Sequence, residues 1–231
     1  MKIALNLLGA LGTVLAGSSQ AATIAGWNFD SVVPTLNDSA AGPTVAASTG
    51  SGSFRGVHAS ADTDWVAYAG NGSNSCYGGD NNWTVGDYFQ FSTSTTGFED
   101  ITISVDQSSH PDGPRDFQLS YSTDGTNFTN FGSVYAIPRQ SPSTGIWQAA
   151  GPRLANAIFS FDLSSITDLD DAGTVYFRLS VASNIAADNG ALLGSRSVID
   201  NVIVSGTAVV PEPGVTLLGA IGMLGLLRRG R

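Results

Sequence analysis

Residues 175–181 read Val-Tyr-Phe-Arg-Leu-Ser-Val, and this stretch decides the fold class. Apolar residues occupy its odd positions, while the even positions hold Tyr176, Arg178 and Ser180. Successive side chains of a β-strand face opposite sides, so the odd positions are expected to point into a core and the even ones away from it. The stretch therefore predicts a strand with one buried face.

The same alternation recurs elsewhere in the chain. Phe89 and Phe91 flank Gln90, and over residues 117–121 Phe, Leu and Tyr alternate with Gln and Ser. An Asp-Gly pair at residues 124–125 follows the second pattern, which predicts a hairpin at that point. Residues 198–204 are apolar on both faces of an extended chain, so we expect this last strand to lie in the middle of a sheet.

Nine strands are expected in all, with no long helical pattern between them. They cover residues 23–29, 65–69, 87–93, 101–107, 116–122, 128–135, 157–162, 175–182 and 197–205. One short helical turn is expected over residues 164–170, capped by Ser164 or Ser165. The Gly/Ser/Asn-rich stretches 35–55 and 70–82 are expected to be surface loops. The pattern predicts an all-β protein, an antiparallel, jelly-roll-like β-sandwich of two packed sheets.

Charge is distributed unevenly along the 231 residues. Between Thr23 and Val210 there are 18 carboxylates, 6 arginines and no lysine, which gives this part of the chain a net charge of −12. A surface this negative repels phosphate backbones, so a nucleic-acid partner is not expected.

The chain offers few residues for nucleophilic or metal chemistry. Cys76 is its one cysteine, which excludes an intrachain disulfide and a Cys-rich zinc site, and burial of the thiol is expected. His58 and His110 are its two histidines, and neither lies in a recognisable Ser-His-Asp context. No catalytic residue, metal ligand or cofactor is assigned from the sequence, and the protein is not expected to be an enzyme.

Clustered carboxylates leave two minor alternatives open. Asp62 and Asp64 form one cluster, and Asp168, Asp170 and Asp171 form another. Such loop oxygens suit Ca²⁺, although neither cluster has EF-hand spacing, so a structural calcium ion stays open with no ligands assigned. A glycan hydrolase needs two carboxylates across a cleft, but Asp beside Gly, Ser or Asn more often forms turns.

Residues 1–22 have the pattern of a signal peptide. Lys2 gives a positive start, residues 3–16 are mostly apolar and uncharged, and small residues at 19–22 offer a cleavage site after Ala21 or Ala22. We expect processing by signal peptidase and export of the protein.

The C-terminus combines three features. Pro211-Glu212-Pro213 disfavours regular helix or central strand, residues 215–227 form an apolar run of 13, and Arg228, Arg229 and Arg231 follow. As a helix the run would be about 20 Å long, short of the roughly 30 Å core of a bilayer. A transient membrane stop is expected, with the arginines on the cytoplasmic side.

These parts, in this order, resemble the PEP-CTERM sorting signal of Gram-negative bacteria. The resemblance covers about the last 23 residues, together with the leader. It implies that an exosortase recognises the tail and cleaves it near Pro211–Pro213. It also implies delivery to the cell surface or to the extracellular polysaccharide matrix. The chain then divides into a signal peptide (1–22), a β-sandwich domain (23–206) and a linker with the sorting tail (207–231).

Sugars are the ligands that the sequence favours most. Trp65, Tyr68, Tyr77 and Trp83 lie in or beside one Gly/Asn-rich stretch. Exposed rings stack on sugar faces while Asn and Asp bind hydroxyls, but the same rings could instead anchor the loop to the core. The main expectation is a non-enzymatic surface or exopolysaccharide-associated matrix protein. The alternatives are a carbohydrate-binding or adhesin module with a specific sugar site and a glycan-active hydrolase.

Overall fold

The computed structural model describes residues 20–31, 34–140 and 146–209. Thirteen strands and two short 3₁₀ helices make up the regular structure of this part of the chain. The strands are β1 (Ala21–Trp27), β2 (Val45–Ala46), β3 (Thr49–Gly50), β4 (Ser53–Val57), β5 (Asp64–Tyr68), β6 (Cys76–Asp80), β7 (Tyr88–Thr93), β8 (Phe98–Ser109), β9 (Asp116–Ser122), β10 (Thr129–Ala136), β11 (Ile158–Asp162), β12 (Val175–Val181) and β13 (Ser197–Ala208). The helices are η1 (Ala155–Ala157) and η2 (Thr167–Leu169).

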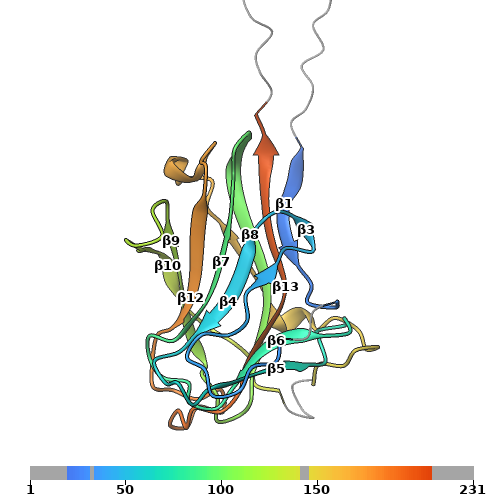
Figure 1. Ribbon diagram of the computed structural model, residues 1–231, viewed down its shortest axis with the longest axis vertical. Helices are drawn as coiled ribbons and strands as arrows, with labels where there is room; N and C mark the ends of the chain where they lie inside the picture. Colours follow the sequence, from blue (N-terminus) through green and yellow to red (C-terminus); the bar gives the residue numbers. More distant parts are fainter. Residues whose placement is uncertain (1–19, 32–33, 141–145, 210–231) are drawn as a thin grey trace, which may run out of the picture.

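The strands form two antiparallel sheets that pack face to face (Figure 1). The six-stranded sheet has the order β10-β9-β12-β7-β4-β2. The seven-stranded sheet has the order β11-β8-β13-β1-β3, with β6 beside β13 and β5 beside β6. The expected all-β, two-sheet antiparallel sandwich is confirmed.

Strand β13 lies in the middle of its sheet, as its two apolar faces predicted. It pairs with β8 on one side and with β1 on the other. Ala21 and Ala22, where cleavage of the leader is expected, already belong to β1, and Ala21 pairs with Thr207. The first and last strands of the described chain therefore leave the sandwich at the same end, which is the upper end in Figure 1.

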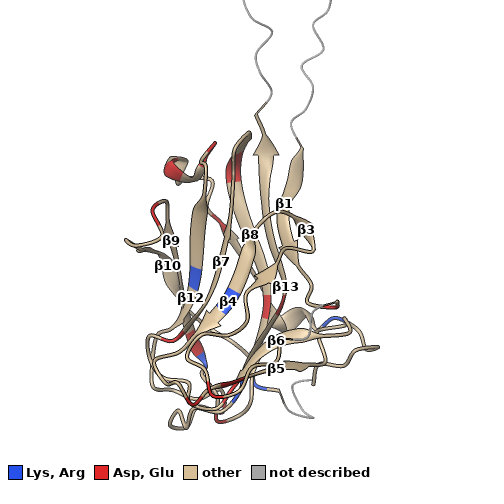
Figure 2. Ribbon diagram, in the orientation of Figure 1, with Lys and Arg blue, Asp and Glu red and all other residues tan. Residues whose placement is uncertain are grey.

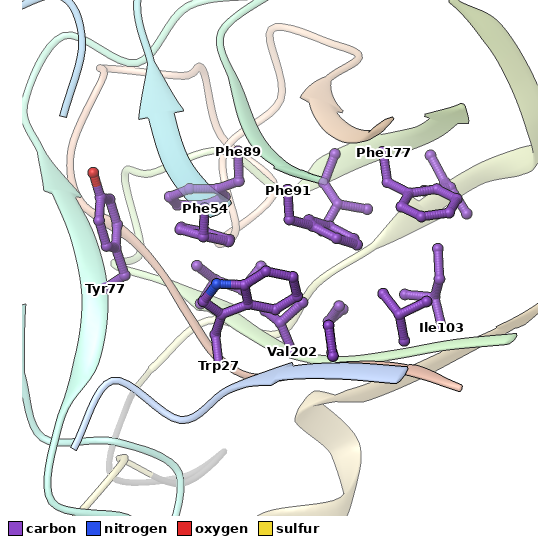
Figure 3. Packing of buried hydrophobic residues seen from close by; sticks show 14 of the residues in the cluster. Trp27, Phe54, Tyr77, Phe89, Phe91, Ile103, Phe177 and Val202 are labelled. Carbon is purple, nitrogen blue, oxygen red and sulfur yellow. The ribbon is translucent and has the colours of Figure 1, made fainter. Parts of the chain in front are cut away.

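The core lies between the sheets and is rich in aromatic rings. All four odd positions of β12 are buried, as their alternation predicted. Trp27 on β1 points across the core to Phe54 on β4 and Phe91 on β7, with ring centroids 6.4 Å and 5.9 Å away (Figure 3). Each such ring contributes roughly 1.5–3 kcal/mol by leaving water, so these contacts hold the two sheets together.

Four strands lie where the sequence predicted loops. β2, β3 and β4 fall in or across the end of the stretch 35–55, and β6 falls in the stretch 70–82. β2 and β3 are only two residues long. For β4 and β6 the reason is glycine: a Cβ at Gly56 would lie 2.0 Å from the Trp65 ring, and one at Gly79 would lie 3.0 Å from the Trp83 ring. In these strands glycine stands where an apolar side chain would clash with a tryptophan ring. The apolar–polar alternation that predicts a strand is therefore missing from their sequence.

The short helical turn also differs in detail from the expectation. η2 begins at Thr167, is preceded by Ile166, and has no side-chain hydrogen bond at its cap. Ser164 and Ser165 are therefore not its caps. Ser164 instead donates its backbone N–H to Asp162 Oδ1 at 3.0 Å.

Both ends of the chain extend beyond the described part. Residues 1–19 of the expected signal peptide lie outside it, as do the motif Pro211-Glu212-Pro213 and Arg228, Arg229 and Arg231. Within the described residues, no helix has the length and apolar character needed to cross a bilayer.

Candidate functional site

Three of the four aromatic candidates belong to the core. Trp65, Tyr77 and Trp83 are at most 1% exposed. The indole N–H groups of Trp65 and Trp83 donate to the carbonyls of Ser39 and Gly79, both at 2.8 Å. The hypothesis that these three rings stack on a sugar is therefore wrong, and the alternative, that they anchor the loop to the core, holds.

Tyr68, the fourth candidate, is half-buried beside a polar hollow. The Arg196 guanidinium lies 4.0 Å from the centroid of the Tyr68 ring. The Tyr68 hydroxyl donates a hydrogen bond to Asp80 Oδ2 at 2.9 Å. The hollow has a volume of about 480 Å³. Its lining is Asp80, Asn81, Asn82, His110, Leu193, Gly194, Ser195 and Arg196. This hollow is one candidate binding site, with a single ring beside it.

A second candidate is the outer face of the six-stranded sheet, which carries several rings together with hydrogen-bonding groups. The strand register places Arg178 opposite Gln90, and Gln90 opposite Arg55 on β4. The next row along the strands is Tyr176, Ser92 and Ser53. We define the outer face as Ser53, Arg55, Tyr88, Gln90, Ser92, Ser120, Tyr176, Arg178 and Ser180.

Arg178 lies at the centre of the outer face, and its guanidinium is held in place from both sides of β12. Its carbon lies 3.7 Å from the ring centroid of Phe128 and 4.2 Å from that of Tyr88 on β7. Its Nε donates to Gln90 Oε1 at 2.8 Å. Among the described residues nothing accepts from Nη1 or Nη2. Such a guanidinium is a planar group of donors that is already ordered by its neighbours.

The loop of the β9–β10 hairpin contains Phe128 and places its ring against Arg178. Asp124 accepts hydrogen bonds from the Asn127 side chain at 2.7 Å and from the backbone N–H groups of Asn127 and Thr126, both at 2.8 Å. The Asn127 side chain, followed by these backbone groups, lowers the pKa of Asp124. Gly125 has φ of +72°, and a Cβ there would lie 3.1 Å from the Tyr176 ring. The predicted Asp-Gly hairpin is confirmed, and its glycine lets the loop fold against Tyr176.

A hollow of about 280 Å³ lies where the outer face meets one end of the sheet. Its lining is Ser51, Gly52, Ser53, Ser92, Thr93, Ser94 and Thr174. The Ser53 and Ser92 hydroxyls are 3.0 Å apart. The serine and threonine side chains here are small, so the hollow has room for a ligand that extends along the strands from Tyr176. Their hydroxyl groups can form hydrogen bonds with such a ligand.

The buried carboxylates form a network on the seven-stranded sheet. The Asp106 carboxylate accepts hydrogen bonds from Nε and Nη2 of Arg153, at 2.7 Å and 2.6 Å. Asp200, opposite Asp106 in the sheet, accepts the backbone N–H of Asn71 at 2.9 Å. Burial raises the pKa of Asp200 to about 7, and the charge of Asp106 adds to the rise. Protein donors occupy these oxygens, which makes the network structural.

Two of the five carboxylates considered for calcium accept backbone N–H groups, whereas the buried Asp170 Oδ1 has no hydrogen-bond partner among the described residues. Asp64 Oδ1 accepts the N–H of Asp38 at 3.2 Å, and Asp171 Oδ1 accepts that of Gly97 at 2.7 Å. In the part of the chain that the structure describes, no three His, Cys, Asp or Glu residues gather in a way that could hold a metal ion.

Neither histidine presents an accessible nucleophile–base pair. His58 Nδ1 lies 2.8 Å from Thr63 Oγ1, but both side chains are buried. His58 is buried against Trp65 and Trp83, and burial lowers its pKa to about 3. His110 Nδ1 lies 3.7 Å from Asp112, but Ser195, which shares its hollow, makes no hydrogen bond to it. An activated serine needs that bond to its base. Cys76 is buried, and burial raises the pKa of its thiol.

Sequence reasoning missed most of the outer face. Alternation did put Tyr176, Arg178 and Ser180 on the face of β12 that points away from the core, and the structure confirms this. Arg55 was missed because its strand was taken for a loop. Tyr88 and Phe128 were missed because only register and the hairpin bring them to Arg178.

Comparison with known proteins gives no family for this chain. No protein-family model matches it, and no curated protein does. Several solved structures show a similar arrangement at low identity.

One of these similar structures is the CBM22-1–GH10 module pair of an endo-1,4-β-D-xylanase from Clostridium thermocellum, complexed with xylohexaose. It has 12% identity and a TM-score of 0.44, over 83% of this chain and 30% of that one. Another is a Paenibacillus xanthan lyase, with 17% identity and a TM-score of 0.42, over 88% of this chain and 14% of that one. A third is the CBM22-1 xylan-binding domain from Paenibacillus barcinonensis, with 6% identity and a TM-score of 0.42, over 84% of this chain and 100% of that one.

This chain thus spans less than a third of the first two proteins. With identities of 6–17% and TM-scores below 0.5, these similarities assign neither a family nor a ligand to it.

Proposed function

We propose that the chain is an exported, non-catalytic polysaccharide-binding protein, and that its jelly-roll-like sandwich binds glycan on the outer face of the six-stranded sheet. The function expected as an alternative from the sequence, a carbohydrate-binding module, thereby becomes the main one. The matrix-associated role becomes the setting in which that binding is used.

The observation that carries the proposal is the ordered guanidinium of Arg178. Phe128, Tyr88 and Gln90 hold the guanidinium, and its two terminal nitrogens have no acceptor within the described residues. A sugar chain is rich in oxygen acceptors, and a donor group that is already ordered loses little entropy when it binds them. Tyr176, half-buried in the next row, offers a ring for stacking.

Binding rather than hydrolysis is proposed because of what the strands of this sheet contain. Glycoside hydrolysis uses two carboxyl groups about 5–10 Å apart across the sugar. Within the six strands as the structure describes them, Asp116 is the one carboxylate, and Arg115 donates to it at 2.7 Å and 3.0 Å. Ser183 donates to it as well, at 2.6 Å. Asp116 is therefore held in an ion pair at the end of β9, without a second carboxylate opposite.

Affinity electrophoresis of the purified full-length protein tests this proposal, in gels that contain soluble neutral or acidic polysaccharides. We expect at least one polymer to retard migration. Tyr176→Ala should weaken that retardation several-fold, because one stacking face is lost. Tyr68→Ala is the matched control, since Tyr68 is also a half-buried tyrosine, but it lies under Arg196 beside the other hollow. Retardation lost in the Tyr68 variant and kept in the Tyr176 variant would move the site to that hollow.

Export and sorting are proposed on sequence grounds. The leader, and the tail of Pro211-Glu212-Pro213, apolar run and arginines, would bring the protein to signal peptidase, briefly to the membrane, and then to exosortase. Its destination would be the cell surface or the polysaccharide matrix. In a host that contains exosortase, mass spectrometry should find a mature C-terminus near Pro211–Pro213. A released protein that still ends at Arg231 would refute the sorting step.

A further inference from the structure

The two arginines of the outer face, Arg55 and Arg178, differ from Arg115 and Arg153 in having no carboxylate partner among the described residues. Arg115 and Arg153 form ion pairs with Asp116 and Asp106. Arg55 and Arg178 lie within ion-pair distance of no carboxylate in the described part of the chain. The whole protein has 19 acidic and 10 basic residues and is therefore negatively charged. Two arginines on one surface without carboxylate partners depart from this overall charge.

The strands around these arginines are also almost free of acidic residues. As described, β2, β4, β7, β10 and β12 contain no Asp or Glu, and β9 contains Asp116 alone. Arg55 lies on β4 and Arg178 on β12. Figure 2 shows a blue segment on each of these strands, while the red segments lie mainly at the ends of the sandwich, in loops and on other strands. The strands of the outer face therefore carry more positive than negative charge on an otherwise acidic protein, while Asp124 lies beside them in the β9–β10 hairpin.

Register fixes the spacing of the two charges. Arg55 and Arg178 both lie opposite Gln90, on the strands to either side of it. Two strand spacings separate their backbones by about 10 Å. Burial of the Arg178 guanidinium and the charge of Arg55 both lower the pKa of Arg178. An anion bound between them would relieve this repulsion.

We propose that the outer face binds an acidic polysaccharide, in which a uronate carboxylate pairs with the planar fork of Arg178 and Arg55 attracts the same polymer. This inference rests on the proposed function and names the chemical class of its ligand. A guanidinium fork matches the two oxygens of a carboxylate, and charge-assisted bonds of this kind are about twice as strong as those to neutral hydroxyls. Partial burial of Arg178 limits the competition from water.

The test compares each acidic polymer with its own uncharged form. Polygalacturonate, alginate and hyaluronan are used beside their carboxyl-reduced derivatives, with the purified full-length protein and affinity electrophoresis. We expect binding of at least one acidic polymer, at least roughly tenfold weaker binding of its reduced form, and weakening by added NaCl.

Three substitutions locate the charge that matters. Arg178→Gln should weaken binding of the acidic polymer roughly tenfold or more. Arg55→Gln, at an exposed position with no described partner, should weaken it a few-fold without risk to folding. Arg196→Gln is the matched control, because Arg196 also stacks on a tyrosine without an ion pair but lies at the other hollow, and it should leave binding unchanged.

Each remaining outcome overturns a definite statement. Equal binding of an acidic polymer and its reduced form would leave glycan binding in place and remove the acidic ligand. A preference for acid that survives both Arg178→Gln and Arg55→Gln, or that disappears in Arg196→Gln, would remove the outer face as its source. Binding of no polymer, acidic or neutral, would refute the proposed function and this inference together.

Discussion

Replacing Asp200 with asparagine tests how strongly the buried network depends on protonation. Asp200 is fully buried, and burial raises its pKa from 3.8 to about 7. Between these values the folded protein keeps a proton that the unfolded chain has already released. The unfolded state then binds fewer protons than the folded state, so the contribution of Asp200 to the free energy of unfolding falls as the pH rises from about 4 to about 7.

The size of this effect follows from the shift. About three pH units, at about 1.4 kcal/mol each, give a loss on the order of 4 kcal/mol across the range. An asparagine at this position cannot ionise and loses nothing. We therefore expect the difference in unfolding free energy, variant minus wild type, to grow by on the order of 4 kcal/mol from pH 4 to pH 8.

The difference is the informative quantity because His58 acts in the opposite direction. Burial lowers its pKa from 6.5 to about 3. Its contribution to stability is complete above pH 6.5 and is lost as the pH falls towards 3. Over the shared range the two groups offset each other in the wild-type protein. His58 is present in both proteins, so its contribution cancels in the difference.

Urea unfolding followed by tryptophan fluorescence at pH 4, 6 and 8 supplies these free energies. Asp62→Asn, which removes an exposed carboxylate, is unfolded in parallel as the control. If the Asp200→Asn difference does not change with pH, then Asp200 titrates in the folded protein as it does in the unfolded chain. The reasoning from burial would then be wrong.

Three further predictions concern packing, charge and the thiol. Phe54→Ala should lower the free energy of unfolding by about 3–5 kcal/mol, because the Phe54 ring is buried against five other rings. Val134→Ala, at an exposed position, should change it by less than about 0.5 kcal/mol. Urea unfolding midpoints compare the two variants. Arg153→Ala should cost about 2–4 kcal/mol, because it leaves the buried Asp106 carboxylate without its cation; a double-mutant cycle with Asp106→Asn should show strong coupling. Cys76 should resist thiol reagents until the protein unfolds, and labelling in native buffer as fast as in urea would contradict its burial.

The sequence predicted strands wherever apolar alternation was clear. Residues 116–122 match β9, and 175–182 differ from β12 by one residue. It failed where glycine replaced that alternation, because the small residues of β4 and β6 accommodate the rings of Trp65 and Trp83, a relation between distant segments. Those two tryptophans illustrate the limit: a ring in a Gly-rich stretch gives no local sign of whether it faces solvent or core.

The outer face was predictable only in part, for a similar reason. Alternation within β12 is a local property, so the orientation of Arg178 could be predicted. The approach of Tyr88, Phe128 and Arg55 depends on register between strands and on a hairpin fold, which single-strand patterns do not specify. The sequence thus predicted one strand of the site, and tertiary structure supplied its partners.

The pairing of Ala21 with Thr207 decides how the molecule would stand if it is tethered. The first and last described strands end at one pole of the sandwich, so an attachment at that pole would leave the sheet carrying Arg178 on the side of the molecule (Figure 1). A fibre lying parallel to the supporting surface could then cross many neighbouring copies at a common height. The weak binding of each copy to the fibre would then combine into a stronger total attachment.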